Sequence, residues 1–129
     1  MASANLTEDG EIFYGGNDTI VIVRHLDSYR GGRTLDVTGY TPEVIKGGHI
    51  IIKETATGEL KPMPVNAGNT AYAALPADHT YEGVNMHTVL TKRPFASILT
   101  NGTVNPVASP FPPPAAAITA LINIQFRAD

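Results

Sequence analysis

The segment HIIIKE, residues 49–54, restricts the fold of this chain more than any other, because its three consecutive isoleucines form the strongest strand pattern in the sequence. The chain then turns at Gly58 and returns through KPMPV. Pro62 and Pro64 cannot donate ladder hydrogen bonds, so this return must lie at a sheet edge or run as extended irregular chain. We expect residues 49–54 and the segment FASIL, residues 95–99, to be core strands.

Glycine and proline divide the rest of the chain into similarly short segments. Twelve glycines and ten prolines imply many turns and little long helix. β-Branched runs and apolar–polar alternation predict further strands at residues 19–26, 34–40, 86–91 and 122–127, with reversals at 31–32 and 101–102 and a helical turn near 71–75. Five prolines precede the run AAAITAL. We therefore predict an all-β domain, a small barrel or sandwich with one short helix near residues 113–120.

Composition limits the partners that this chain can have. Charged residues make up only 16% of the sequence, so some neutral or apolar surface must stay exposed or be buried against other subunits. A net charge of −3 gives no general attraction to nucleic acid or to an anionic membrane, and we expect neither as a partner. The N-terminal residues lack the basic and apolar regions of a secretory signal, so we expect a soluble protein.

The sequence contains no recognisable catalytic or metal-binding pattern. The absence of cysteine excludes disulfides, thiolate catalysis and cysteine-ligated metal sites. His25 and Asp27 share one strand face, but no second pair of ligands has comparable spacing, so we expect no metal and no cofactor. His79 follows an aspartate without the serine elbow of a hydrolase. A small hydrolase that uses His79 and His87 stays an alternative, and the preferred expectation is that the protein is not an enzyme.

Two long segments carry a family resemblance. They are DVTGYTPEVIKGGHIIIKETATGELKPMPV and YEGVNMHTVLTKRPFASILTNGTVNPVA, and the C-terminal ALINIQFRAD is similar to the closing strand of the same proteins. Over roughly residues 34–108 the chain resembles the head-fibre and head-decoration proteins of tailed bacteriophages. The matching parts are Ile45 to Glu54, Gly58 to Val65, Gly83 to Leu90 and Gly102 to Asn105.

The resemblance implies a non-enzymatic virion protein, often a homotrimer, made in the host cytoplasm and placed on the outer surface of the capsid. Its partner would be the major capsid protein, and a fibre or another head protein could also bind. No long fibre-forming repeat follows the compact part, so we expect a decoration protein or the base of a head fibre that stabilises the shell.

The N-terminal region lies outside the stretch that carries the resemblance. We divide the chain into an N-terminal arm and strand region, residues 1–33, which contacts a partner, and a compact β domain, residues 34–129. Apolar and guanidinium side chains are frequent anchors at protein interfaces. The partner-binding candidates are Ile12, Phe13, Tyr14, Arg24, Arg30 and Arg33.

A carbohydrate-binding or host-attachment β module is the main alternative function. Such a module needs exposed aromatic side chains on one face, and Tyr40, Tyr72 and Tyr81 are the candidates. The absence of tryptophan weighs against this alternative.

Overall fold

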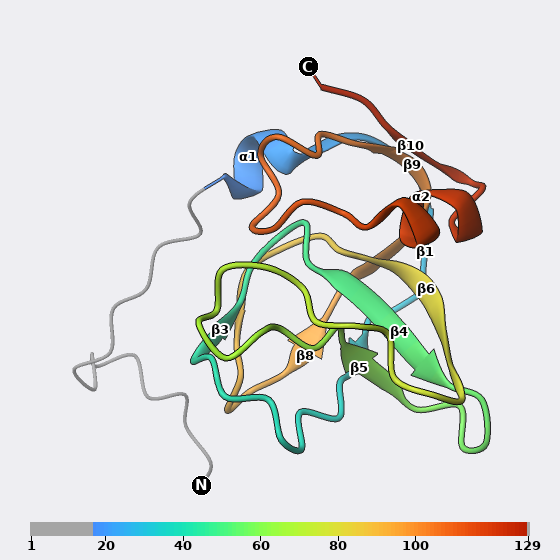
Figure 1. Cartoon of the computed structure of the whole chain (residues 1–129). Helices are drawn as coiled ribbons and strands as arrows, with labels where there is room; N and C mark the ends of the chain where they lie inside the picture. Colours follow the sequence, from blue (N-terminus) through green and yellow to red (C-terminus); the bar gives the residue numbers. More distant parts are fainter. Residues whose placement is uncertain (1–16, 129) are drawn as a thin grey trace, which may run out of the picture.

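Six strands form the main sheet of the computed structural model, which describes residues 17–128 (Figure 1). Five of them pair antiparallel, in the order β1 (Ile22–Ser28), β9 (Ile98–Val104), β6 (His79–Asn85), β4 (Ile50–Glu54) and β5 (Leu60–Pro62). The sixth strand, β10 (Ile124–Phe126), pairs parallel with β9. The strand β9 is therefore the centre of the sheet, with β1 on one edge and both β6 and β10 on the other.

Two small ribbons and two short helices complete the described part of the chain. The ribbons pair β2 (Arg33–Thr34) with β8 (Phe95–Ala96), and β3 (Val44–Ile45) with β7 (Val89–Leu90). The helices are α1 (Asp18–Val21) and α2 (Ala115–Ala120). The all-β prediction is confirmed. The sheets do not close into a barrel, because β1 and β5 end the strand order of the main sheet without pairing with each other.

Side chains of β4 enter the core on both faces of the sheet. Ile50 and Ile52 pack with Met63 and with Ala117 of α2 on one face. Ile51 points to the other face, where it packs in a cluster with Leu35, Ile45, Leu60, Ala96 and Ile98. A strand that is covered on both sides reads as a continuous apolar run, and this explains the three isoleucines. The prediction that residues 49–54 form a core strand is confirmed.

The segment 95–99 is a core segment with one exception. Ala96, Ile98 and Leu99 are fully buried, whereas Phe95 is 61% exposed. Phe95 lies on β8, one of the small ribbons, and not on the main sheet. The expectation that all its apolar residues enter the core was therefore wrong for Phe95.

The first described residues are fastened to the domain by Asp18. Its carboxylate accepts hydrogen bonds from the Thr88 backbone N–H at 2.8 Å and from the Thr88 hydroxyl at 2.7 Å. Three residues later, Val21 is buried in a third cluster with Val84, Leu99, Val104, Ala108, Leu121 and Ile124. β1 then pairs with β9, so this part of the predicted N-terminal region is an edge strand of the main sheet.

Three predicted elements are absent from the structure. β9 runs straight through residues 101–102, where we expected a turn, because Gly102 pairs with His25 of β1. Residues 35–40 form turns, since the Asp36 carboxylate accepts hydrogen bonds from the N–H and hydroxyl of Thr38. Near residues 71–75 the chain forms a single bridge between Tyr72 and Val65 instead of a helical turn. At residues 101–102 and at Tyr72 a longer-range contact overrides the local pattern, whereas at residues 35–40 a local side-chain hydrogen bond does so.

Other local predictions are confirmed. The reversal at residues 31–32 uses two glycines with φ of +75° and +77°, a region that other residues rarely adopt. The KPMPV return begins in β5 at the edge of the sheet, as the prolines require. α2 begins directly after Pro114, and β10 covers the predicted closing strand. In the described residues, neither α1 nor α2 has the length and hydrophobicity that a membrane-spanning helix needs.

Gly83 marks the closest approach of β6 to β9. A Cβ atom at this position would overlap the backbone carbonyl oxygen of Leu99 and would lie 2.9 Å from Cγ2 of Ile98. Both neighbours are buried, and one of them is backbone, so neither can move aside easily. The pairing of β6 with β9 therefore depends on a residue without a side chain.

We expect Gly83→Ala to lower the free energy of unfolding by about 3 kcal/mol, because it overpacks the centre of the sheet. Gly68→Ala is the matched control, since the nearest atom to a Cβ there is 3.8 Å away and φ is not positive. The control should change stability by less than about 1 kcal/mol. Chemical denaturation measures both values, and equal stability of the two variants would contradict the close approach.

Candidate functional site

Arg30 lies on the turn that follows β1, and Arg33 begins β2 directly after that turn. Arg30 is exposed, and the guanidinium carbon of Arg33 lies 5.0 Å from the centre of the Tyr29 ring. The Nη1 of Arg33 donates hydrogen bonds to the carbonyl oxygens of Arg30 at 3.2 Å and of Gly32 at 2.9 Å. These contacts hold an exposed guanidinium in one position, which reduces the entropy that a partner must remove on binding.

Tyr29 connects this turn to the main sheet. Its hydroxyl donates a hydrogen bond to the Glu82 carboxylate of β6. Burial first, and then this bond to Glu82, raise the pKa of Tyr29 to about 12. Glu82 also lies 3.8 Å from the ammonium group of Lys53 on β4. The turn is therefore anchored by a polar chain that crosses two strands.

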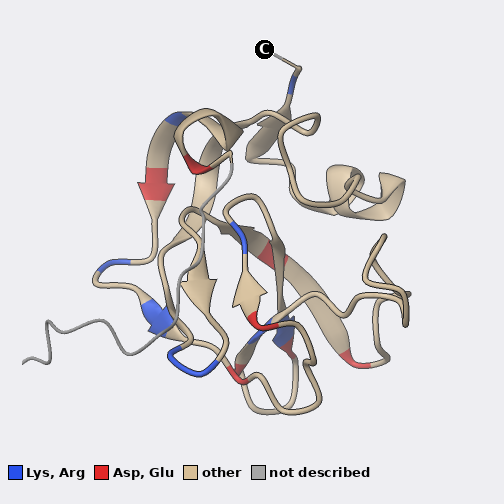
Figure 2. Ribbon diagram, turned by 90° about the vertical axis from the view of Figure 1, so that its left-hand side faces the viewer, with Lys and Arg blue, Asp and Glu red and all other residues tan. Residues whose placement is uncertain are grey.

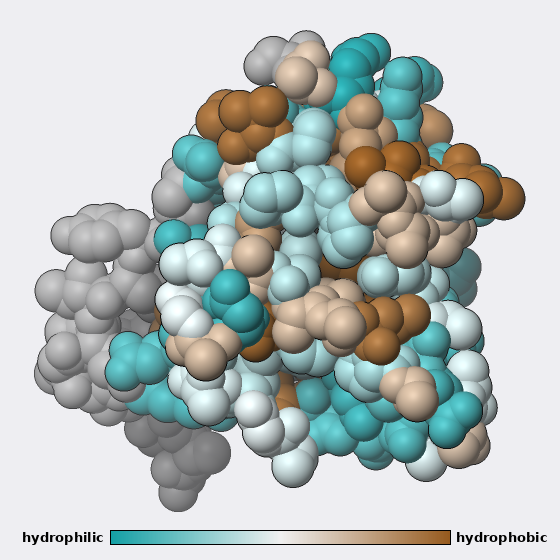
Figure 3. All heavy atoms as spheres, viewed as in Figure 1, coloured by the Kyte–Doolittle hydropathy of each residue, from teal (hydrophilic) through white to brown (hydrophobic). Residues whose placement is uncertain are grey.

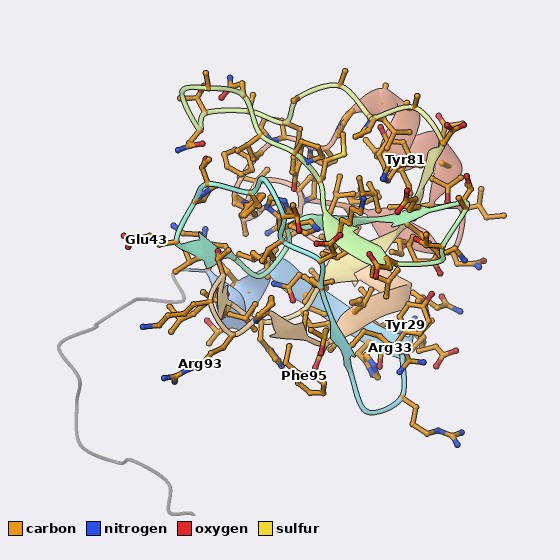
Figure 4. All side chains as sticks on the ribbon, turned by 90° about the horizontal axis from the view of Figure 1, so that it is seen from below. Tyr29, Arg33, Glu43, Tyr81, Arg93 and Phe95 are labelled. Carbon is orange, nitrogen blue, oxygen red and sulfur yellow. The ribbon has the colours of Figure 1, made fainter. Side chains whose placement is uncertain are left out.

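The arginines continue into an exposed strip around Phe95. Thr34 pairs with Phe95 between β2 and β8, so Arg33 and Phe95 are close neighbours on the same ribbon. Arg93 is exposed two residues before Phe95. Figure 4 shows Phe95 between Arg33 and Arg93, and Figure 2 shows the basic segments along this side of the molecule. We call Arg30, Arg33, Arg93 and Phe95 the arginine strip.

The structure brings together only some of the predicted partner-binding residues. Arg30 and Arg33 are in the arginine strip. Arg24 is exposed near the start of β1, at the other end of that strand from Arg30 and Arg33. Ile12, Phe13 and Tyr14 lie outside the described residues. Arg93 and Phe95 were not predicted as site residues, and the only signal for them was Pro94, which lies between the two and begins the segment that contains β8.

A second exposed surface is apolar. It consists of large apolar side chains that are exposed to solvent. They are Ile20 next to β1, Val107 after β9, and Ile118 and Ile122 around α2. Val107 and Ile122 are the most exposed, at 78% and 84%. Figure 3 shows hydrophobic residues over α1 and, as a separate group, over α2 and β10, towards the top of the view in Figure 1. We call Ile20, Val107, Ile118 and Ile122 the apolar end.

Three aromatic rings surround the buried His49. Its ring lies edge-on to Tyr40, Tyr72 and Phe111, with centroids 5.7, 5.1 and 5.9 Å away. Nε2 of His49 lies 2.8 Å from the carbonyl oxygen of Met63. A carbonyl can only accept, so the neutral ring carries its proton on Nε2. Burial lowers the pKa of His49 to about 4, although the bond to Met63 acts in the opposite direction.

The tyrosines expected for a carbohydrate-binding face do not form one. The Tyr72 hydroxyl accepts a hydrogen bond from the Ile50 N–H at 2.9 Å, and burial raises its pKa. Burial likewise raises the pKa of Tyr40 to about 12, and Tyr40 packs against the cluster that contains Ile51. Tyr81 packs between the two other clusters. These three rings serve the core and are not aligned on one exposed surface.

The histidines of the hydrolase alternative are also separated. His79 begins β6 and its Nδ1 donates to the carbonyl oxygen of Ala77 at 2.7 Å, whereas His87 lies beyond the other end of β6. A seven-residue strand puts the two rings on the order of 20 Å apart. Within residues 17–128, no three His, Cys, Asp or Glu side chains lie close enough to hold a metal ion.

His49 predicts a pH dependence of stability. Above its ordinary pKa of 6.5 the residue is neutral in both the folded and the unfolded chain. As the pH falls from 6.5 towards 4, the unfolded chain binds a proton that the folded protein does not, so the free energy of unfolding falls by up to about 3 kcal/mol. Denaturation at a series of pH values measures this loss.

His49→Gln is the matched variant, because an amide N–H can still reach the Met63 carbonyl but does not titrate. In this variant, the free energy of unfolding should no longer fall as the pH decreases from 6.5 to 5. Hydrogen bonds from Thr38 and Thr57 are the main causes that lower the pKa values of the Asp36 and Glu54 carboxyls. These two groups therefore change the free energy of unfolding only at lower pH. An equal slope in the two proteins over that window would contradict a buried neutral His49.

Comparisons of the chain with protein-family models, with curated proteins and with solved structures found no match.

Proposed function

We propose that this chain is a non-enzymatic virion structural protein that binds the outer surface of an assembled phage capsid and stabilises it. It would act as a decoration protein or as the base of a head fibre, with the major capsid protein as its partner. The proposal is supported by the sequence resemblance over residues 34–108 and by the exposed surfaces of the domain.

The observation that carries the proposal is the apolar end. Large apolar side chains that a small domain leaves exposed mark surface that another protein covers. Ile20, Val107, Ile118 and Ile122 are exposed although the same domain buries almost every other isoleucine in its core. Substituting such side chains at the centre of an interface commonly costs 1 kcal/mol or more each. We therefore assign the attachment face to the apolar end.

Weak individual contacts are sufficient for a protein of this kind. Many copies act on one shell, so modest affinity at each position adds up to strong retention of the capsomers. A ligand that binds only the assembled lattice also stabilises that lattice by mass action.

We further propose that the protein is a homotrimer, in solution or on the shell. Icosahedral lattices offer local three-fold positions, which a cyclic trimer occupies without breaking symmetry. A second protomer would cover part of the exposed apolar surface, and a fibre or another head protein could bind on the outward side.

The first test is co-sedimentation of the full chain with capsids that lack it. We expect the protein to pellet with assembled capsids and to remain in the supernatant with unassembled capsid protein. Val107→Gln and Ile122→Gln should each weaken binding about five-fold or more, since both side chains are exposed and their loss removes apolar contact without disturbing the core.

Ala56→Gln is the control, because Ala56 is exposed in the β4–β5 turn and belongs to neither exposed surface. It should bind like the unchanged protein. No binding of the full chain to capsids would contradict the proposed function. Normal binding by both apolar-end variants would contradict the attachment face.

The second test is the mass of the assembly. Light scattering should give three times the chain mass of 13.7 kDa, either for the free protein or for the protein released from particles. A monomer mass in solution, together with single isolated copies on the particle surface, would contradict the trimer.

A further inference from the structure

The acidic charge of this chain is concentrated at its N-terminus. Glu8, Asp9 and Glu11 are three of its twelve acidic residues, and none of its nine Lys and Arg residues precedes Arg24. The remaining residues therefore carry equal numbers of acidic and basic side chains. The acidic group is followed directly by the apolar residues Ile12, Phe13 and Tyr14.

The arginine strip has the complementary chemistry. Arg30, Arg33 and Arg93 are exposed, and within residues 17–128 none of them forms an ion pair with a carboxylate. Phe95 lies exposed beside them, and its ring is next to Gly32. An acidic segment with an aromatic end matches this surface in both charge and hydrophobicity.

The acidic segment is also within reach of the strip. Asp18 is bonded to Thr88, and Arg93 follows Thr88 by five residues. Asn17 follows Glu11 by six positions, and an extended chain spans roughly 3.3–3.6 Å per residue, or about 20 Å for six. Five residues of extended chain span at most roughly 18 Å, so Arg93 lies within reach of the acidic residues of the same molecule.

We propose that residues 8–14 dock on the arginine strip of their own chain, with the carboxylates of Glu8, Asp9 and Glu11 on the arginines and an aromatic ring against Phe95. A short tether gives the segment a local concentration in the millimolar range, so even weak ion pairs suffice for docking. This inference goes beyond the proposed function, because it concerns a contact within the free protein and not the apolar end.

The chain has no tryptophan, so a single indole reports on this contact without interference. Phe13→Trp in the full-length protein places the reporter in the acidic segment. We expect acrylamide to quench its fluorescence several-fold less than that of free tryptophan, because the docked ring is shielded by Phe95. Adding Arg30→Glu and Arg33→Glu, or raising the salt concentration to 1 M, should remove the protection.

Two further variants test the charge pairing. Lys46→Glu changes an exposed cation outside the strip and should leave the protection intact. Glu8→Arg and Asp9→Arg should restore it when they are combined with Arg30→Glu and Arg33→Glu. Recovery by the swapped charges would support direct pairing, because a general loss of stability could not be reversed in this way.

Full quenching in every variant, or protection that the arginine substitutions do not change, would overturn the docking. Protection that rises with protein concentration would show docking between molecules and would overturn the assignment to the same chain. The measurement needs no capsid, so its failure is separate from a failure of the proposed function.

Discussion

The buried side chain of Asn85 connects the end of β6 to the β3–β7 ribbon, which no long strand joins to it. Its amide nitrogen lies 3.1 Å from the carbonyl oxygens of Ile45 and Lys46 and 2.7 Å from that of His87. Its backbone N–H and C=O pair with His49 and Gly48. Because one buried amide satisfies carbonyls from both sides of the β3–β7 ribbon, the ribbon is fixed to the end of β6. The loop fixed in this way includes Thr88, to which Asp18 bonds, so the position where the N-terminal segment enters the domain also depends on Asn85.

The second constraint is the central position of β9, which has to accept three neighbours. β1 pairs with one edge of β9 over most of the length of β9. On the other edge, β6 pairs only with Ile98 and Leu99, and β10 pairs only with residues 102–104. β6 and β10 can share an edge because β6 diverges after Leu99. Gly102 lets the Arg24 carbonyl approach more closely than any Cβ would permit. The C-terminal segment is therefore an integral part of the sheet, and α2 reaches the core through Ala117 as a consequence.

The sequence predicted the elements whose signals are local. Four of them follow from the conformational preferences of a few adjacent residues. They are the isoleucine run, the glycine reversal at residues 31–32, the edge position of Pro62 and the helix after Pro114. The pair Asn101–Gly102 is a frequent hairpin signal, yet here glycine serves close packing against β1. Phe95 belongs to an apolar segment and still faces solvent, because adjacent residues of a strand point to opposite sides and Ala96 takes the buried side. Such outcomes depend on distant partners, which no local pattern encodes. The same reason explains why only Arg30 and Arg33 of the arginine strip were predicted.

Ile20 and Val107 of the apolar end lie at the opposite end of the β1–β9 pair from the arginine strip. Ile20 precedes β1 and Val107 follows β9, and hydrogen bonds from Asn17 to Ala108 and from Asn105 to Val21 hold these segments together. The arginine strip lies where β1 ends and β9 begins. Seven-residue strands separate Ile20 and Val107 from the strip by about 20 Å, which is more than twice the Debye length at physiological ionic strength. Charges on the strip therefore exert little force on a partner at the apolar end. Attachment through apolar contact and docking of the acidic segment are electrostatically independent, and a partner that covers Ile20 and Val107 leaves the strip accessible to residues 8–14.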